Sequence, residues 1–253
     1  MKEPDKSLDV LGIKPIGNAI ESVTQGIVSG ASAFLSRICL PAAEEFGLLL
    51  RDRVSAWRAT NAAAIANHAQ KLLAPDGDPA SLHAHPRIVA NVIELGSWSN
   101  AEEVRQMWGG LLASACTPDG TDDSNLMFVD LLSKLTVSQA RLFDYICKNC
   151  KKAVASGGWI YADDFQLSLD ALKRITGLTD FHRIDLELDH LRTLGLLHDL
   201  QGGFTPDSTD ANMSPSALAL QMYVRCQGSP RDPVSFYDAK PSKSPEVQPQ
   251  TPK

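Results

Sequence analysis

The sequence contains no run of apolar residues long enough to cross a membrane. Its longest uncharged stretch near the N-terminus, Ser22 to Ser36, would reach only about 22 Å as a helix, against ~30 Å for the hydrocarbon core of a bilayer. The opening residues MKEPDKSLDV also lack the positive and then apolar pattern of a secretory signal. We therefore expect a cytoplasmic protein with no transmembrane span.

Cysteine is scarce and irregularly placed, which argues against a disulfide framework. The five cysteines are odd in number and lie within apolar helical patterns, as reduced thiols of a cytoplasmic protein do. Cys147 and Cys150 form C-x-x-C near the end of a predicted helix, whereas a redox pair lies at a helix start, where the dipole lowers the thiol pKa. A zinc site would need a second pair of ligands. We expect no metal or cofactor.

The short motifs of common catalytic sites are also absent. The sequence has no G-x-S-x-G, no P-loop and no H-E-x-x-H, and it shows no pair of carboxylates spaced for shared acid-base work. We therefore predict that the protein is not an enzyme. A site assembled from distant helices would carry no such motif, so that alternative stays open.

What the sequence does contain is the pattern of a mainly α-helical protein. Its 43% hydrophobic and 21% charged residues are typical of a soluble globular chain. The run Asn100 to Cys116 spaces its apolar residues by three and four, as on one stripe of a helix. The stripe consists of Val104, Met107, Trp108, Leu111, Leu112 and Ala115. We expect Trp108 to be buried, Asn100 to cap this helix and Glu103 to complete a capping box.

Further helices are predicted on both sides of this one, in a helical bundle. We expect one long helix over residues 41–73, a short one over 86–95 and another from Phe128 to Leu135. Thr136 and Gln139 form a T-x-x-Q capping box for the next helix. The predicted organisation is an N-terminal helical region (1–75), a central helical core (76–155), a winged-helix-like module (156–227) and a Pro-rich tail (228–253) that we expect to be disordered.

The winged-helix-like module is predicted from the order of its elements. Trp159 to Tyr161 form a short strand, and a helix runs from its cap Ser168 to Gly177. A helix from Asp180 to Leu194, a hairpin turning at Gln201 to Gly203 and a last helix starting at Ser214 complete the module. This order gives a short three-stranded β element beside the helices.

The charge of this module argues against DNA binding. The helix from Asp180 to Leu194 has two arginines and four acidic residues, a formal charge of 2 − 4 = −2, and the whole chain has a net charge of −6. A helix that enters the major groove should carry the opposite balance. We therefore interpret the module as a packing or protein-contact unit and do not expect a nucleic-acid partner.

Two surface features each allow two interpretations. Arg51, Arg58 and Asn61 on the predicted long helix are our candidate contact with a partner. The alternative is a solvated face for the arginines and, for Asn61, a hydrogen bond to neighbouring backbone or water. Gly26 and Gly30 form a G-x-x-x-G spacing that favours close helix packing. The alternative for the Gly-rich segment from Ser22 to Leu40 is an association with a membrane surface.

Several stretches of the chain match one family of bacterial proteins. In EEFGLLLRDRVSAWRATN, Trp57, Arg58 and Asn61 form W-R-x-x-N, and the other matching stretches are HPRIVANVIELGS, AEEVRQMWGGLLASACTPDG, MFVDLLSKLTVSQARLFDYI and MSPSALALQMYVRC. Over Glu44 to Cys226 the chain resembles the Abi-alpha family, the abortive-infection alpha proteins of bacteria and their mobile elements. The resemblance implies a role in antiviral defence, in which infected cells are sacrificed or arrested, and it brings no catalytic residues.

Three functions follow from these observations. We favour a non-enzymatic antiviral defence protein that acts through contact with a protein partner or through self-association. The second is a membrane-perturbing effector that uses the Gly-rich N-terminal segment. The third is a winged-helix DNA-binding regulator, which a salt-dependent interaction with DNA would support.

Overall fold

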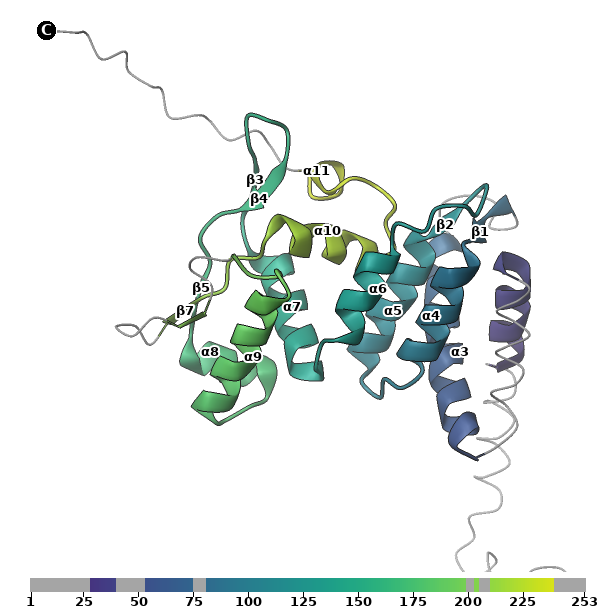
Figure 1. Ribbon diagram of the computed structural model, residues 1–253, viewed down its shortest axis with the longest axis horizontal. Helices are drawn as coiled ribbons and strands as arrows, with labels where there is room; N and C mark the ends of the chain where they lie inside the picture. Colours follow the sequence, from purple (N-terminus) through teal and green to yellow (C-terminus); the bar gives the residue numbers. More distant parts are fainter. Residues whose placement is uncertain (1–27, 40–52, 75–80, 199–202, 205–209, 239–253) are drawn as a thin grey trace, which may run out of the picture. The chain divides into compact units, whose positions relative to one another are not determined.

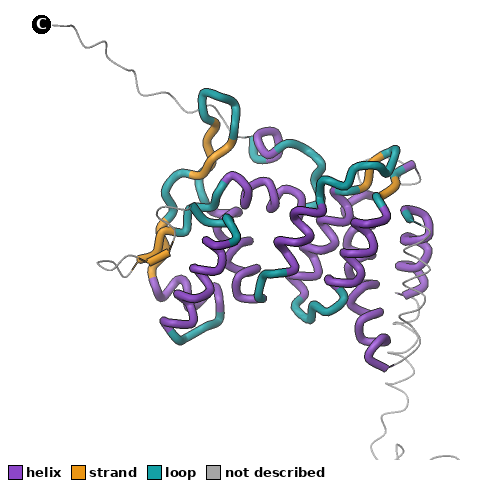
Figure 2. Tube along the Cα trace, in the orientation of Figure 1, coloured by secondary structure: helices purple, strands orange, loops and turns teal. Residues whose placement is uncertain are grey.

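The computed structural model describes residues 28–39, 53–74, 81–198, 203–204 and 210–238, and it is mainly helical with small antiparallel sheets (Figures 1 and 2). The chain divides into two compact units, Met1–Val129 and Asp130–Lys253. Each unit is described by itself below. The predicted fold class is confirmed.

The first unit is built from helices that pack on one another. A helix over residues 28–38 is followed by α3 (Arg53–Leu73), α4 (Pro86–Gly96) and α5 (Glu102–Ser114). The first residues of α6 (Leu126–Ser133) form the C-terminal end of this unit. The two-residue strands β1 (His83–Ala84) and β2 (Cys116–Thr117) pair antiparallel and join the segment before α4 to the end of α5. The predicted helix over 86–95 is therefore confirmed as α4.

The core of this unit lies where α3 crosses α5. Small residues on α3, among them Ala62, Ala66 and Ala69, are fully buried and let the two backbones approach. A Cβ added at Gly109 of α5 would lie 2.9 Å from the carbonyl oxygen of Ile65. Trp108 is only 2% exposed, which confirms its predicted place in the core.

The predicted starts of two helices have different outcomes. The N-cap of α5 is Ala101, whose side chain forms no capping bond, so the predicted Asn100 cap and its capping box with Glu103 are wrong. The reason is a competing partner, because the Asn100 side chain accepts a hydrogen bond from the Trp57 indole instead. Of the long helix predicted over 41–73, residues 53–73 form α3, and the rest lies outside the described residues.

The helix over residues 28–38 lies beside α3 (Figure 1) and buries its apolar side. Ala31, Phe34, Leu35 and Ile38 are at most 2% exposed. A Cβ added at Gly30 would lie 3.9 Å from Oδ1 of Asn67 on α3. Gly26, the other half of the predicted G-x-x-x-G pair, is outside the described residues.

The second unit begins with α7 (Val137–Asn149), which has the predicted capping box of Thr136 and Gln139. Both capping residues also bind α9 (Phe181–Thr193): the Thr136 hydroxyl donates to Oε2 of Glu187 over 2.9 Å, and the Gln139 amide donates to the Glu187 carbonyl. The Glu187 carboxylate is 4% exposed and pairs with Arg183 at 2.7 Å. One buried acid on α9 thus joins the cap of α7 to an arginine on its own helix.

Two small sheets complete this unit. The strands β3 (Lys152–Val154) and β4 (Ile160–Ala162) form an antiparallel hairpin. The other sheet has the order β5-β7-β6, from β5 (Gln166–Ser168), β6 (Gly203–Phe204) and β7 (Asp210–Asn212). Between β5 and β6 lie α8 (Leu169–Thr176) and α9, which begin at the predicted caps Ser168 and Asp180. Gly177 ends α8 as predicted, in the left-handed conformation.

The sequence of elements α7, β5, α8, α9, β6, β7 follows the predicted order of the winged-helix-like module, with two strands assigned differently. The first strand of its sheet is β5, because the region around Trp159 to Tyr161 pairs with β3 instead. Of the predicted hairpin turn, Gln201 and Gly202 lie outside the described residues, and Gly203 and Phe204 pair with β7. Before that turn, Leu197 forms only an isolated bridge with Pro215.

The C-terminal part of the second unit extends further than predicted. The last long helix, α10 (Ala217–Cys226), is capped by Ser216 and not by Ser214. A short helix, α11 (Pro233–Phe236), follows, so the described fold reaches Asp238, beyond the predicted start of the tail at residue 228. Residues 239–253 of that tail lie outside the described residues.

Candidate functional site

A cluster of two tryptophans and an arginine joins the start of α3 to the end of α4. We call it the tryptophan clamp, and it consists of Trp57, Arg58, Glu94, Ser97 and Trp98. Its positions follow from helix geometry, because Trp57 and Arg58 lie one turn before Asn61 on α3, and Ser97 and Trp98 follow directly after the last residue of α4.

Arg58 is the centre of the clamp, and its guanidinium group forms three hydrogen bonds. Its Nε donates to Oγ of Ser97 over 3.0 Å, and Nη2 donates to the Glu94 carbonyl over 3.1 Å and to the Glu94 carboxylate over 2.8 Å. The guanidinium carbon also lies 4.3 Å from the ring centre of Trp98, a cation–π distance. With a side chain only 12% exposed, Arg58 is held in one conformation.

Asn61 fixes the connection between α4 and α5 from the inside. It is 5% exposed, and its amide donates to the Ser97 carbonyl over 2.9 Å. Its Oδ1 accepts from Nη1 of Arg105, which also donates to the carbonyls of Ser99 and Asn100. Asn61 and Arg105 therefore supply the polar partners that this connection needs where it turns.

The tryptophans form the exposed part of the clamp. Trp98 is 52% exposed and Trp57 38%, and Leu95 beside them is 38% exposed. The two rings are tilted with their centres 6.1 Å apart, and the Trp57 indole donates to Oδ1 of Asn100 over 3.0 Å. The result is an exposed aromatic surface whose side chains are already fixed.

The predicted contact residues have different places in this arrangement. Arg58 and Asn61 come together with the α4–α5 connection, where they bind backbone and side chains of the chain itself. Arg51 lies outside the described residues. The structure adds Trp98 and Leu95, which the sequence pattern did not single out. The available signal was a tryptophan in the polar connection S-W-S-N between two apolar helices.

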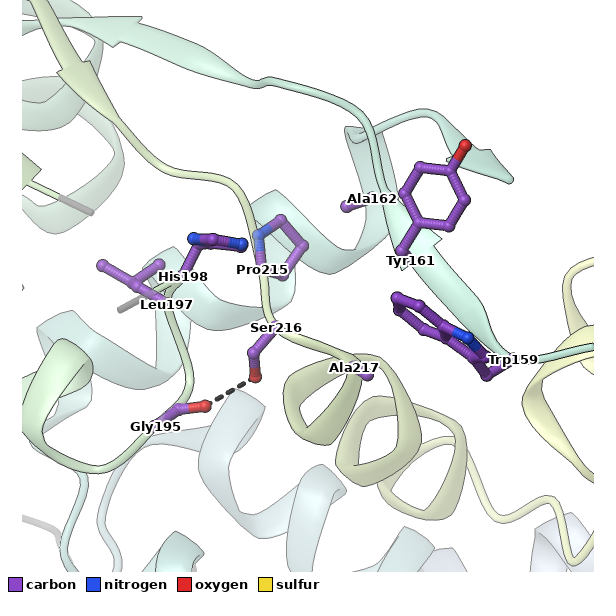
Figure 3. Close-up of a pocket in the computed structure, with 9 residues that line it drawn as sticks. All are labelled: Trp159, Tyr161, Ala162, Gly195, Leu197, His198, Pro215, Ser216 and Ala217. Atoms are coloured by element: carbon purple, nitrogen blue, oxygen red, sulfur yellow. Dashed lines mark hydrogen bonds between the residues drawn. The ribbon is translucent and has the colours of Figure 1, made fainter. Parts of the chain in front are cut away.

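The second unit has a groove of about 650 Å³ beside β4 (Figure 3). Trp159 and Tyr161 stand on one side, with ring centres 5.9 Å apart, and the segments after α9 and before α10 form the other. Its lining residues are Trp159, Tyr161, Ala162, Gly195, Leu197, His198, Pro215, Ser216 and Ala217. The Trp159 side chain is 60% exposed, so the groove offers an aromatic surface that the described fold does not cover.

The far wall of the groove is held by short-range pairing. Leu197 bridges Pro215, the His198 amide donates to the Ser214 carbonyl over 3.1 Å, and the Ser216 hydroxyl donates to the Gly195 carbonyl (Figure 3). Ser216 also accepts from the Ala219 amide, as the cap of α10. Its hydroxyl is therefore a structural group and not a free nucleophile.

The cysteines lie inside the fold as free thiols. All five are free and buried. Burial raises the pKa of Cys147 well above its ordinary value and raises the pKa of Cys150, the two members of the C-x-x-C pair. Desolvation likewise raises the pKa of Cys116 to about 12. Within the part of the chain that the structure describes, no group of three or more His, Cys, Asp or Glu side chains is placed to hold a metal ion.

On α9, the two arginines are paired with acids of the same helix. Arg183 contacts the buried Glu187, and Arg192 contacts Asp189. A cation that is already paired has less charge to offer a phosphate.

The fold and these surfaces define a mainly helical protein with two small antiparallel sheets in its second unit and an exposed aromatic cluster in each unit. Comparison with protein families gives a more specific assignment, because the sequence model of the family described as abortive infection alpha matches residues 59–214. The chain belongs to this family, as its resemblance over Glu44 to Cys226 predicted. No curated protein and no solved structure gives a significant match. Across the described residues, no helix combines the length and the apolar character needed to span a bilayer.

Proposed function

We propose that this protein acts in abortive infection as a non-enzymatic protein that binds a protein partner through the tryptophan clamp. The family supports a defence role, as its description names abortive infection. The observation that supports the contact is the exposure of Trp57 and Trp98 around an arginine that is already fixed in place.

The clamp has the chemistry that strong protein interfaces use. Tryptophan and arginine are enriched among the residues that contribute most to binding energy. A side chain that is already held loses little conformational freedom on binding, and each such side chain saves about 0.5–1.5 kcal/mol. Arg58 is held by three hydrogen bonds and Trp57 by one, so the partner would meet a preorganised surface.

Three observations support this proposal over a membrane-perturbing effector, a DNA-binding regulator and an enzyme. A membrane-perturbing segment would need a free apolar face, and the apolar side of the helix over residues 28–38 is buried in the first unit. A DNA-binding helix would need free cations, and Arg183 and Arg192 on α9 have acidic partners. Burial raises the pKa values of the Cys147 and Cys150 thiols and keeps them protonated, which supports a non-enzymatic role.

The proposal is tested by phage challenge of bacteria that express the full chain. Trp98→Ala removes the most exposed ring of the clamp and leaves the Arg58 hydrogen bonds in place. We expect protection to fall at least tenfold, with the melting temperature close to that of the wild type. Met127→Ala is the matched control, because Met127 is 54% exposed in the same unit and lies outside the clamp. Full protection by a Trp57→Ala/Trp98→Ala double variant would refute a functional clamp.

A further inference from the structure

We propose that the groove beside Trp159 and Tyr161 binds the chain's own proline-rich segment, residues 239–253. This is an intramolecular site for an extended peptide in the second unit. It is separate from the tryptophan clamp and does not depend on the proposed function.

The first argument is the chemistry of the groove walls. Trp159 and Tyr161 present two aromatic rings from the β3–β4 hairpin, and Pro215 and Ala217 lie across the groove from them (Figure 3). Grooves lined by aromatic rings bind proline-rich segments, because such segments are already extended and lose little entropy on binding. Trp159 has most of its surface exposed, although its ring is large and apolar.

The second argument is the open edge of β4. Alternate residues of an antiparallel strand direct their backbone groups toward and away from the partner strand. The Asp163 amide donates to the Lys151 carbonyl, and the Ala155 amide donates to the Trp159 carbonyl. In this register the backbone groups of Ile160 and Ala162 point away from β3. Among the described residues these groups have no hydrogen-bond partner on another strand, and Ala162 lines the groove. An extended peptide would satisfy them by adding along this edge.

The third argument is where the described chain ends. Tyr237 already rests on this part of the unit: its hydroxyl donates to the Leu220 carbonyl of α10 over 3.4 Å, its ring stacks on Tyr223, and Nζ of Lys152 lies 4.7 Å from its ring centre. Lys152 is the register partner of Ala162. Tyr237 therefore contacts the same β3–β4 hairpin that carries the aromatic rings of the groove.

The segment that follows has the length and the composition to occupy the groove. It reads AKPSKSPEVQPQTPK and holds prolines at 241, 245, 249 and 252. An extended proline-rich chain advances about 3.1 Å per residue, so the ten residues from Tyr237 to Val247 can span up to about 31 Å. Pro245 and Val247, the one aliphatic residue after Ala239, would then lie at the aromatic rings.

The test is photo-cross-linking in the full chain. A Val247→benzoylphenylalanine variant is irradiated, and the cross-linked peptides of the monomer are mapped by mass spectrometry. We expect cross-links to peptides that contain Trp159 to Ala162 or Pro215 to Ala217. In a second version that also carries Trp159→Ala, the yield should fall at least fivefold. The matched control is Met127→Ala, which removes an exposed apolar side chain of the first unit outside the tryptophan clamp and should leave the yield unchanged.

Each other result of this experiment overturns the inference. Cross-links between two molecules would place the segment in another copy of the chain, and cross-links to other peptides would place it on another surface. Absence of cross-links would leave the groove without this occupant. A yield that survives Trp159→Ala, in a variant with the wild-type circular dichroism spectrum, would show that the aromatic wall does not hold the segment.

Discussion

At the scale of single residues, Arg58 and Asn61 show how one sequence pattern can conceal a structural role. For Arg58 the sequence favoured a solvated face over a partner contact, and for Asn61, which interrupts the apolar seam, it favoured a hydrogen bond to backbone or water. In the structure they bind Glu94 and Ser97, 36 to 39 residues further along the chain. Helical periodicity describes only neighbours three or four residues apart. The partners of these two side chains were therefore outside its reach, and so was the importance of Trp98.

His68 gives a prediction at the same scale. It lies against Gly109 of α5, and its pKa is lowered, first by burial and then by the nearby charge of Lys71. Below pH ~6.5, the ordinary histidine pKa, the unfolded chain therefore binds more protons than the folded protein. The free energy of unfolding should decrease as the pH falls below that value, by less than the ~1.4 kcal/mol per pH unit of one full proton.

Urea denaturation of the wild type and of His68→Gln between pH 7.5 and 5 measures this effect. As the pH falls, the free energy of unfolding of the wild type should decrease relative to that of His68→Gln, because only the wild type has a histidine at this position that takes up a proton on unfolding. His182→Gln, at an exposed position, serves as the control for removing a histidine. A difference that stays constant with pH would contradict the assignment.

At the scale of elements, the sequence located helices better than strands. The caps Thr136, Ser168 and Asp180 and the left-handed Gly177 were predictable because a cap is a local hydrogen bond within four residues. The strands have only two or three residues each, too few for an alternating pattern. Gly203 was therefore predicted in a turn, whereas Gly203 and Phe204 pair with β7, although the presence of a small sheet was correctly predicted.

The packing of α3 against α5 gives a prediction for one element pair. A Cβ at Gly109 would lie 2.9 Å from the Ile65 carbonyl oxygen and 2.9 Å from Cβ of His68, and neither atom can turn aside. Gly109→Ala should therefore lower the free energy of unfolding by about 1–3 kcal/mol, although alanine is the better helix former. Thermal or urea unfolding measures the change.

Gly30→Ala is the matched control for that substitution. Gly30 also lies in a helix, but its nearest neighbour for an added Cβ is 3.9 Å away. This variant should be neutral or more stable by up to ~1 kcal/mol, because alanine loses less entropy in a helix than glycine. Equal stability of the two variants would mean that α3 and α5 are not in close backbone contact.

At the scale of the whole molecule, composition and family agree. The ordinary share of apolar residues predicted a globular chain with a core, their spacing predicted helices, and the resemblance to abortive-infection proteins was confirmed over residues 59–214. The surfaces were harder to predict, because helical periodicity identifies a buried stripe but not which exposed side chains gather in space. Trp108, on the apolar stripe of α5, is 2% exposed, whereas Trp98, in the connection after α4, is 52% exposed.

The net charge of −6 leads to a prediction for the intact protein. With Arg183 and Arg192 paired to acids on α9, few counterions would be released from a duplex. We expect no retardation of a 30-base-pair duplex at micromolar protein in 50 mM salt, where non-specific binding would be strongest. A retained complex that weakens steeply between 50 and 200 mM salt would instead support a DNA-binding regulator.

The capping box of α7 has one more consequence. Its two side chains also bind the carboxylate and the backbone carbonyl of Glu187, 48 to 51 residues away. The same two residues therefore cap the start of α7 and attach α9 to it. Separation of α9 would leave the first turn of α7 without a firm cap, and fraying of that turn would expose a buried carboxylate. The two helices should therefore open together, as one cooperative step, and the slowest-exchanging amides of both should share a single opening free energy.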